Sequence, residues 1–457
     1  MSRTMAPVIS ELEVALPAGT VLTEGDLMER YRFDRSNAVG AGRPLAVVRV
    51  SDTAEVQTVL RWASAQRVPV VTRGAGTGLS GGSIAVDGCI TLSTERMRRI
   101  EIDASARLAV AQPGALNAEV KEAARAQGLW YPPDPSSFEI CSIGGNVATN
   151  AGGLCCVKYG VTTDYVLGME VVLADGRALR LGGRTIKDVA GYDLKRLFTG
   201  SEGTLGVITE VKLRLRPPPP TPTTMVAMFA DAERAGRAIS RIAACGSPAV
   251  LELMDRTSVH AVERQFNMGL ADCGALLLGQ WDVSGAQGMA EVQTMVDACR
   301  EAGADEVYAT TDEDEGSQFM AARRAAIPAV EKLGNVLIED VGVPLARVAE
   351  LIGGIERIAE KRSTLIATIG HAGDGNFHPL VVFDRDDPVA VTRAEVAFGE
   401  VMDLAVSLGG TITGEHGVGT LKRGWLEEQV GADVLAVMHA VKNALDPLGI
   451  LNPGKAI

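Results

Sequence analysis

The sequence predicts an α+β protein with more than one domain, and three observations support this class. The chain has 457 residues, which is too long for one ordinary hydrophobic core. Strand and helix patterns alternate from Pro44 to Gly74, and the run RPPPPTP, Arg216 to Pro222, then interrupts any regular element. Beyond this run the alternation indicates an antiparallel sheet with helices on one face.

The first part of the chain is expected to hold a lead-in, residues 1–39, followed by a mixed region that ends near residue 218. A short helix is predicted near Asp26–Phe33. The other elements predicted there are strand LAVVRV, helix TAEVQTVLRWASAQ, strand VPVVTRG, strands Cys89–Leu92 and Arg107–Ala111, a helix over Gly114–Gln127, and strands Gly168–Ala174 and Gly206–Leu215.

The second part begins at residue 219, and its predicted elements alternate in type. They lie in MVAMFADAERAGRAISRIAA, LLLGQWDVSG, AEVQTMVDACREAGA and DEVYAT. The tail, from about Gly410, carries a motif of its own and ends in GILNPGK. The expected boundaries therefore lie after residues 39, 218 and 410.

Composition excludes several classes of function. The net charge of -13 argues against a nucleic-acid partner, because a polyanion would be repelled over most of the surface. No run of eighteen apolar residues predicts a transmembrane helix, and the first twenty residues lack the pattern of a secretion signal. The seven cysteines include no C-x-x-C pair, which suits reduced thiols. We expect a cytoplasmic protein, and peripheral membrane contact stays open.

The stretch RGAGTGLSGG, Arg73 to Gly82, contains a literal G-x-G-x-x-G. A Rossmann fingerprint requires a helix after this loop, but the following GGSIAVDGCITLST has no helical period and leads into another strand. The loop is therefore predicted to wrap a phosphate with its backbone N–H groups, since glycine lacks a Cβ. A merely flexible loop remains the alternative.

Two further stretches have the same character. PPDPSSFEICSIGGNVATNAGG, Pro132 to Gly153, combines small residues, amides and glycines, and FTGSEGTLGVIT, Phe198 to Thr209, precedes a strand. Three such loops could line a long, flat ligand that carries phosphate. In combination they resemble the FAD domain of the vanillyl-alcohol-oxidase (PCMH) type in FAD-linked D-2-hydroxy-acid dehydrogenases. The resemblance runs from about residue 40 to the C-terminus.

The resemblance implies a PCMH-type FAD-binding domain over residues 40–218, a substrate or cap domain over 219–410, and a C-terminal segment, 411–457, that returns to the flavin. FAD is expected to bind non-covalently, because the flavin loops contain no His. The implied contacts to FAD are Arg73, Gly74, Ala75, Gly76, Thr77, Gly78, Leu79, Ser80, Pro133, Asp134, Ser137, Cys141, Gly144, Gly145, Asn146, Thr149, Asn150, Gly152, Gly153, Glu202, Gly203, Gly206, Val207, Ile208 and Asn452.

Three of the five histidines fall in two motifs, HAGDGNFHP from His371 and TGEHGVG from Thr413. Apolar runs flank the first motif, so it predicts a β-hairpin, and Asp374-Gly375 suits a two-residue type I′ turn. That register places His371 directly opposite His378, with Cβ atoms roughly 4.5–5.5 Å apart. Two imidazoles this close can converge on one divalent metal, and Glu415 is the natural third ligand.

The family resemblance implies the same three ligands, which would bind Zn²⁺ or Mn²⁺. It also implies that His416 is the catalytic base. Hydride would leave the substrate Cα for flavin N5. Arg323 is the candidate for the substrate carboxylate, because guanidinium matches a carboxylate in bidentate fashion; a solvated helix pair, Arg323-Arg324, is the alternative. Lys187 and Tyr192 are weaker candidates near flavin and substrate.

Two apolar residues favour a small substrate. Relatives that act on a longer dicarboxylate resemble this chain but carry a Lys and an Asn at the positions of Ile338 and Leu380. A monocarboxylate such as D-lactate or glycolate is therefore expected. A D-2-hydroxyglutarate dehydrogenase, a metallohydrolase and a non-catalytic flavin subunit of an oxidase remain alternatives. The electron acceptor stays open among quinone, cytochrome, electron-transfer flavoprotein and oxygen, and a homodimer is compatible with the sequence.

Overall fold

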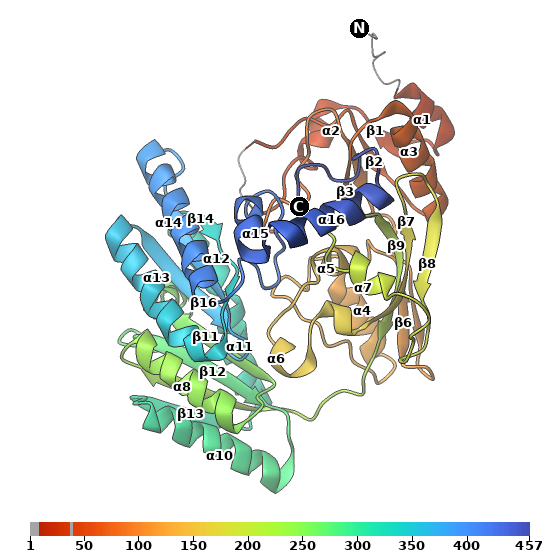
Figure 1. Ribbon diagram of the computed structural model, residues 1–457. Coiled ribbons are helices and arrows are strands. Elements are labelled where there is room, and N and C mark those ends of the chain that lie inside the picture. The colour runs from red at the N-terminus through yellow and green to blue at the C-terminus, as the bar shows by residue number, and fades with distance from the viewer. Residues whose placement is uncertain (1–8, 37–39) are drawn as a thin grey trace. The chain divides into compact units, whose positions relative to one another are not determined.

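The computed structural model describes residues 9–36 and 40–457 and confirms the α+β class (Figure 1). The described chain divides into two compact units. The first comprises the residues up to 151 together with 161–218 and 415–457, and the second comprises 152–160 and 219–414. The parts of the predicted lead-in at residues 1–8 and 37–39 lie outside the described residues.

The first sheet of the first unit has the strand order β1-β2-β4-β3. Its strands are β1 (Val21–Leu22), β2 (Ala46–Arg49), β3 (Val70–Arg73) and β4 (Ile90–Ser93). Both β2 and β3 run parallel to β4. The helices that precede or join these strands are α1 (Ser10–Ala15), α2 (Gly25–Glu29) and α3 (Thr53–Gln66). The predicted α3 is confirmed, whereas the helix predicted near Asp26–Phe33 ends earlier.

The second sheet of the first unit is antiparallel, with strand order β5-β6-β9-β7-β8. Its strands are β5 (Ile100–Asp103), β6 (Leu108–Ala111), β7 (Val166–Val172), β8 (Ala178–Gly182) and β9 (Val207–Arg214). The remaining helical segments of this unit are α4 (Asn117–Arg125), α5 (Ile143–Thr149), η1 (Thr162–Asp164), α7 (Leu194–Phe198), α15 (Arg423–Val430) and α16 (Ala432–Leu445).

The second unit is built on an eight-stranded sheet, and its antiparallel pairing confirms the prediction. Its path is β13-β10-β12-β11-β16-β17-β14, and β15 pairs with β17. The strands are β10 (Thr223–Phe229), β11 (Val250–Asp255), β12 (Ala275–Trp281), β13 (Glu306–Thr310), β14 (Asn335–Ile338), β15 (Val341–Gly342), β16 (Leu365–His371) and β17 (Asn376–Phe383).

Helices of the second unit connect these strands, and Figure 1 shows α8, α10, α13 and α14 gathered on one side of the sheet. The helical segments are α6 (Cys156–Tyr159), α8 (Ala232–Cys245), α9 (Arg256–Phe266), α10 (Gly285–Glu301), α11 (Glu313–Arg324), α12 (Ala326–Glu331), η2 (Leu345–Arg347), α13 (Val348–Arg362) and α14 (Pro388–Ser407). No helix in the described ranges is both long and apolar enough to cross a membrane.

Residues 152–160 depart from the predicted boundary, which placed them inside a continuous region from 40 to 218. They group with the second unit. Lys158 and Tyr159 of α6 both bond the buried Asp282, and Val157 lies against Gly373. These polar contacts and this packing place residues 152–160 in the second unit. The sequence of the segment itself does not indicate either of them.

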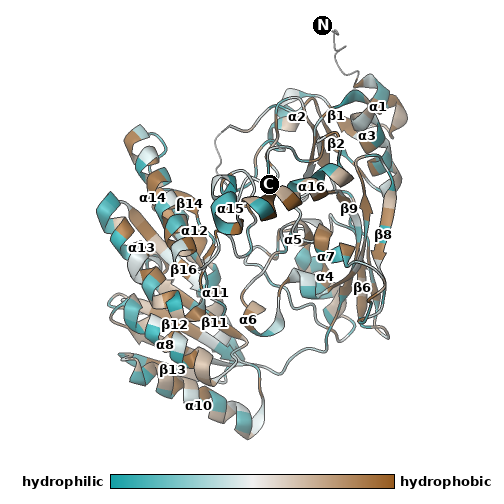
Figure 2. Ribbon diagram, viewed as in Figure 1, coloured by the Kyte–Doolittle hydropathy of each residue, from teal (hydrophilic) through white to brown (hydrophobic). Residues whose placement is uncertain are grey.

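Apolar side chains fill the sheets of both units. In the first unit one core cluster surrounds the parallel strands β2, β3 and β4, and another surrounds β6, β7 and β9. In the second unit β12 is buried along nearly its whole length, and Figure 2 shows it as an apolar strand. This burial supplies most of the favourable free energy of folding and leaves the loops at the sheet ends to carry function.

Candidate functional site

The first glycine loop connects two parallel strands without a helix. It leaves β3 at Arg73 and reaches β4 at Ile90, and the two strands pair in parallel. The prediction that the G-x-G-x-x-G match is not a Rossmann fingerprint is thus confirmed. In the described part of the chain, the backbone N–H groups of residues 76–80 donate to no acceptor within the protein. Such a run of unused donors suits an anionic group.

Glycine is required inside this loop. Gly76 has φ +74°, and a Cβ there would lie 2.0 Å from Nη2 of Arg73. The Arg73 guanidinium donates to the carbonyls of Phe33, at 2.7 Å, and Arg30, at 3.4 Å. Its charge is therefore used to hold the N-terminal segment, and burial lowers its pKa.

The second tract contains a helix that the sequence did not predict. Ser142 caps α5, because its Oγ accepts from Gly145 N–H at 3.4 Å, and Asn150 ends the helix at φ 52°. The same Ser142 Oγ accepts the N–H of Ala75 at 3.2 Å. Ser142 was not among the predicted site residues, although serine is one of the residues preferred at a helix N-cap.

Hydrogen bonds bring the three predicted tracts together within the first unit. Glu202 N–H donates to the carbonyl of Ala148 at 2.8 Å, which joins the third tract to α5. Asn452 Nδ2 donates to the carbonyls of Gly82, at 2.9 Å, and Glu202, at 2.7 Å. The tail thus reaches the first and third tracts.

The other predicted flavin contacts lie around these three tracts. Pro133 accepts from the Asn117 side chain at 3.2 Å, and the buried Cys141 lies beside Asn146. Residues 206–208 lead into and begin β9. Gly152 and Gly153 are the exceptions, because they belong to the 152–160 segment of the second unit.

In the second unit, β16 and β17 form the predicted hairpin, but the predicted register is wrong. His371 pairs with Asn376, and His378 pairs with Ile369. A type I′ turn needs positive φ at both central residues, and of Asp374 and Gly375 only the glycine has it, at φ 81°. The loop therefore takes four residues, 372–375, and the carbonyl of His371 accepts the N–H groups of Asp374 and Gly375.

The two histidines still lie together despite the shifted register. A shift of two positions keeps both side chains on the same face of the sheet, because side chains alternate with period two. The ring centroids of His371 and His378 are 5.1 Å apart, with an interplanar angle of 82°. Both residues are buried, so the paired imidazoles form a sheltered polar site.

A buried acid connects His371 to Arg323. Glu252 on β11 is the direct cross-strand neighbour of His371. Its Oε1 lies 2.7 Å from His371 Nδ1, and its Oε2 lies 2.6 Å from Arg323 Nη2. Arg323 is only 2% exposed, so the alternative of a solvated helix pair is wrong. Glu252 was missed, and the only signal was an acid inside the apolar run AVLELM.

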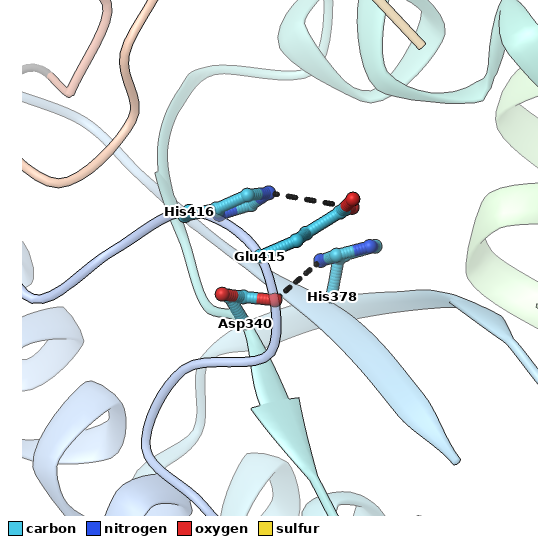
Figure 3. Close-up of side chains that lie close together, drawn as sticks. All are labelled: Asp340, His378, Glu415 and His416. Carbon is cyan, nitrogen blue, oxygen red and sulfur yellow. Dashed lines mark ion pairs between the residues drawn. The ribbon is translucent and has the colours of Figure 1, made fainter. Parts of the chain in front are cut away.

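Asp340 is the second residue that the predicted site lacked. Its carboxylate accepts from Asn376 Nδ2 at 2.9 Å, Thr413 Oγ1 at 2.6 Å and Gly414 N–H at 2.9 Å. Asp340 Oδ1 also lies 3.6 Å from His378 Nδ1 (Figure 3). Asp340 is fully buried and thereby fastens the end of the second unit, residues 411–414, to β17.

Glu415 and His416 follow Gly414 directly. His416 Nε2 lies 4.0 Å from Glu415 Oε1 (Figure 3). In the first unit, Ser80 Oγ donates to the backbone carbonyl of His416 at 3.0 Å. The residue predicted as base is therefore tied to the first glycine loop. Lys187 and Tyr192, the weaker candidates, are exposed, Tyr192 to 94%.

Two family models match the chain. The model described as "FAD linked oxidases, C-terminal domain" matches residues 218–456, and the model described as "FAD binding domain" matches residues 44–182. The first of these alone covers more than half of the chain. Together they span the first two glycine-rich tracts and both histidine motifs, and the third tract lies between the two matches.

Curated relatives agree with these models over nearly the whole chain. Glycolate oxidase subunit GlcD of Bacillus subtilis (strain 168) is 42% identical, over 90% of this chain and 88% of that protein. The GlcD subunit of Escherichia coli (strain K12) is 40% identical, over 98% and 91%. D-lactate dehydrogenase of Archaeoglobus fulgidus is 36% identical, over 94% and 96%.

Solved structures support the predicted fold. A 4-ethylphenol oxidase from Gulosibacter chungangensis superposes with a TM-score of 0.81 at 20% identity, over 100% of this chain and 97% of that chain. A p-cresol methylhydroxylase superposes with a TM-score of 0.81 at 18% identity, over 98% and 96%. The fold is thus the PCMH type, and the family models and relatives show that this chain belongs to the FAD-linked oxidase family, as an FAD-dependent oxidoreductase.

Proposed function

We propose that this protein oxidises a small D-2-hydroxy acid, D-lactate or glycolate, to the 2-oxo acid, with non-covalent FAD and a divalent metal, Zn²⁺ or Mn²⁺. One observation carries the proposal: the buried row His371–Glu252–Arg323. The two oxygens of one carboxylate hold an imidazole, which can bind a metal, and a guanidinium, which can bind a carboxylate. A 2-hydroxy acid offers a partner to each.

The first unit is suited to FAD. The unused N–H groups of residues 76–80 fit the pyrophosphate, and the tracts around α5 and Glu202, joined by Asn452, would line the rest of the cofactor. When bound, FAD supplies the hydride acceptor, and the protein supplies its position. The relatives named as glycolate oxidase subunit and D-lactate dehydrogenase favour this chemistry.

The proposed metal ligands are His371, His378 and Glu415. Glu252 beside His371 Nδ1, and the Glu339 carbonyl 3.3 Å from His378 Nδ1, favour protons on those nitrogens and lone pairs on Nε2. Asp340, His378, Glu415 and His416 each carry a donor atom of the kind that Zn²⁺ and Mn²⁺ accept. A bound metal would act as a Lewis acid on the substrate hydroxyl.

Asp340 is assigned the role of an anchor. A carboxylate offers about four lone-pair positions, and three donors already occupy those of Asp340. One of these donors is Gly414 N–H, and the Cα of Glu415 follows that of Gly414 at about 3.8 Å. Asp340 therefore fixes the point from which Glu415 extends.

Arg323 would hold the substrate carboxylate, and His416 would take the proton of the substrate hydroxyl at a ring nitrogen. Arg323 Nε is buried and donates to no acceptor among the described residues, so it retains a donor for an anion. An imidazole titrates near neutrality, as a general base requires.

The region near His378 favours a short substrate. Ile338 and Leu380 are cross-strand partners, both buried, and Leu380 lies two residues from His378 on the same face of β17. Both side chains are apolar, so neither can pair with the distal carboxylate of a dicarboxylic acid. That carboxylate would then be a buried charge without a partner, which is costly. This pair separates the proposal from D-2-hydroxyglutarate oxidation.

Anaerobic flavin bleaching tests the proposal. The FAD-loaded protein is mixed without oxygen with D-lactate, L-lactate, glycolate or D-2-hydroxyglutarate, and the flavin absorbance is followed. We expect rapid bleaching with D-lactate or glycolate and much slower bleaching with the other two. Faster bleaching with D-2-hydroxyglutarate would overturn the substrate assignment, and no bleaching with any acid would overturn the function.

A further inference from the structure

A buried carboxylate in the first unit has both of its oxygens bonded to backbone. Glu202 lies between α7 and β9, is 8% exposed and has φ 50°, a left-handed conformation that is costly for a residue with a Cβ. Its own backbone N–H and carbonyl are bonded to Ala148 and Asn452. The residue is therefore held rigidly in a strained conformation, with its side chain directed at another segment.

That segment is the turn that follows His416. Glu202 Oε1 accepts the N–H of Val418 at 2.8 Å, and Oε2 accepts the N–H of Gly419 at 2.8 Å. Gly417 and Gly419 have φ of 88° and 53°, so successive N–H groups can turn toward one anion, as in a backbone nest. A Cβ on Gly417 would lie 2.9 Å from Glu202 Cδ, which leaves no room for a side chain.

The other side of the same turn is held by the first glycine loop. The Ser80 side chain donates to the His416 carbonyl, and the Ser80 carbonyl accepts from Thr420 at 2.9 Å and Leu421 at 3.1 Å. A Cβ on Gly419 would lie 2.0 Å from this same carbonyl oxygen. Residues 416–421 are thus clamped between Ser80 and Glu202.

We propose that Glu202 is a positioning residue for His416 and not a contact of the cofactor. Its carboxylate clamps the turn at Val418 and Gly419 against the glycine loop, so the geometry of the proposed base is fixed by the same unit that would bind FAD. The effect on turnover rests on the proposed function. The clamp itself is a property of the fold and can be measured without substrate.

Glu202→Gln is the test variant, because the amide has the same shape but presents an NH₂ donor to one of the two N–H groups. With D-lactate or glycolate and FAD bound, kcat should fall on the order of 100-fold, as expected when a reacting group is misplaced. KM and the FAD dissociation constant should not change. Hydrogen exchange at residues 417–421 should become faster. Glu210→Gln, a partly exposed acid on β9, is the matched control and should change none of these quantities.

Two results would overturn the proposal. Weaker FAD binding with native kcat at saturating FAD would make Glu202 a cofactor contact, and native exchange at 417–421 would remove the clamp. If Glu202→Gln does not fold, Gly417→Ala keeps the carboxylate and displaces the turn, and it should reproduce the loss of kcat and the faster exchange. If no hydroxy acid is oxidised at all, the exchange experiment still decides the clamp, so its failure is distinct from that of the proposed function.

Discussion

The two units prepare their sites in opposite ways. The first unit presents backbone: a loop of small residues whose N–H groups at 76–80 have no protein acceptor, in a chain path that Gly76 makes feasible. The second unit presents buried side chains in mutual contact, with Glu252 between His371 and Arg323, and Asp340 among Asn376, Thr413 and Gly414. In the proposal, the cofactor is held by the shape of a backbone loop, whereas the reaction depends on charged side chains held in fixed positions.

The comparison predicts its largest effect at His416. His416→Ala should lower kcat by about 10²–10⁴-fold, the contribution of a general base, because no other side chain takes its role in the proposal. FAD should remain bound, since the substitution keeps the His416 carbonyl, which accepts from Ser80 of the glycine loop. Steady-state kinetics and the flavin spectrum of the purified variant measure both quantities. Native kcat would exclude His416 as the base.

Glu252→Gln should weaken metal binding by changing the second unit alone. The amide keeps the volume but cannot hold both a protonated Nδ1 and a guanidinium, so the Mn²⁺ dissociation constant should rise by about 10–100-fold. Titration calorimetry with Mn²⁺ on the FAD-bound protein measures this change. Glu233→Gln, an exposed acid on α8 paired with Arg237, is the control. An unchanged affinity for Mn²⁺ would show that Glu252 does not orient a ligand.

Gly76→Ala should affect the first unit in the complementary way. Forcing Ala to φ +74° costs about 1–2 kcal/mol, and the new Cβ meets the Arg73 guanidinium. The FAD dissociation constant should rise and the melting temperature should fall, while the affinity of the protein for Mn²⁺ stays native. Gly183→Ala, which meets no atom closer than 3.9 Å, is the control. Native FAD affinity in Gly76→Ala would contradict a role for the loop conformation.

The smallest expected effect lies away from both sites, at Glu400 on α14. Arg362 and Lys361 of α13 lower the pKa of this carboxyl to about 2. A depressed pKa in the folded state gives stability that is present above the ordinary value of 4.5 and is lost as the pH falls toward 2. In Glu400→Gln the acid-induced loss of stability over this range should be shallower, as measured by denaturant unfolding at several pH values. An unchanged profile would mean that solvent screens the pair fully.

The glycine-rich loops of the first unit could be predicted from the sequence because their signal is local. Residues 73–82 contain their own signal, and the absence of a helix after them was readable from the missing period. The helix α5 was missed because it is short and glycine-rich, so propensity argued against it. Its capping serine was the one clue.

In the second unit the sequence predicted the histidine pair but not the acids beside it, because sheet pairing brings these residues together from distant parts of the chain. The histidine pair lies within one hairpin, and even there the predicted register was wrong by two positions. Glu252 reaches His371 through the pairing of β11 with β16, and Asp340 reaches Gly414 across a long separation in sequence. Neither pairing has a local pattern, so buried acids in apolar strands could be noticed but not connected.

Leu451 pairs with Val70, the first residue of β3, and the whole of the second unit lies between these two residues in the chain. A ribosome therefore delivers the entire second unit before the first can close its parallel sheet. During synthesis the inserted unit can gain its antiparallel pairing early, while β3 waits with one edge open for the last segment to emerge.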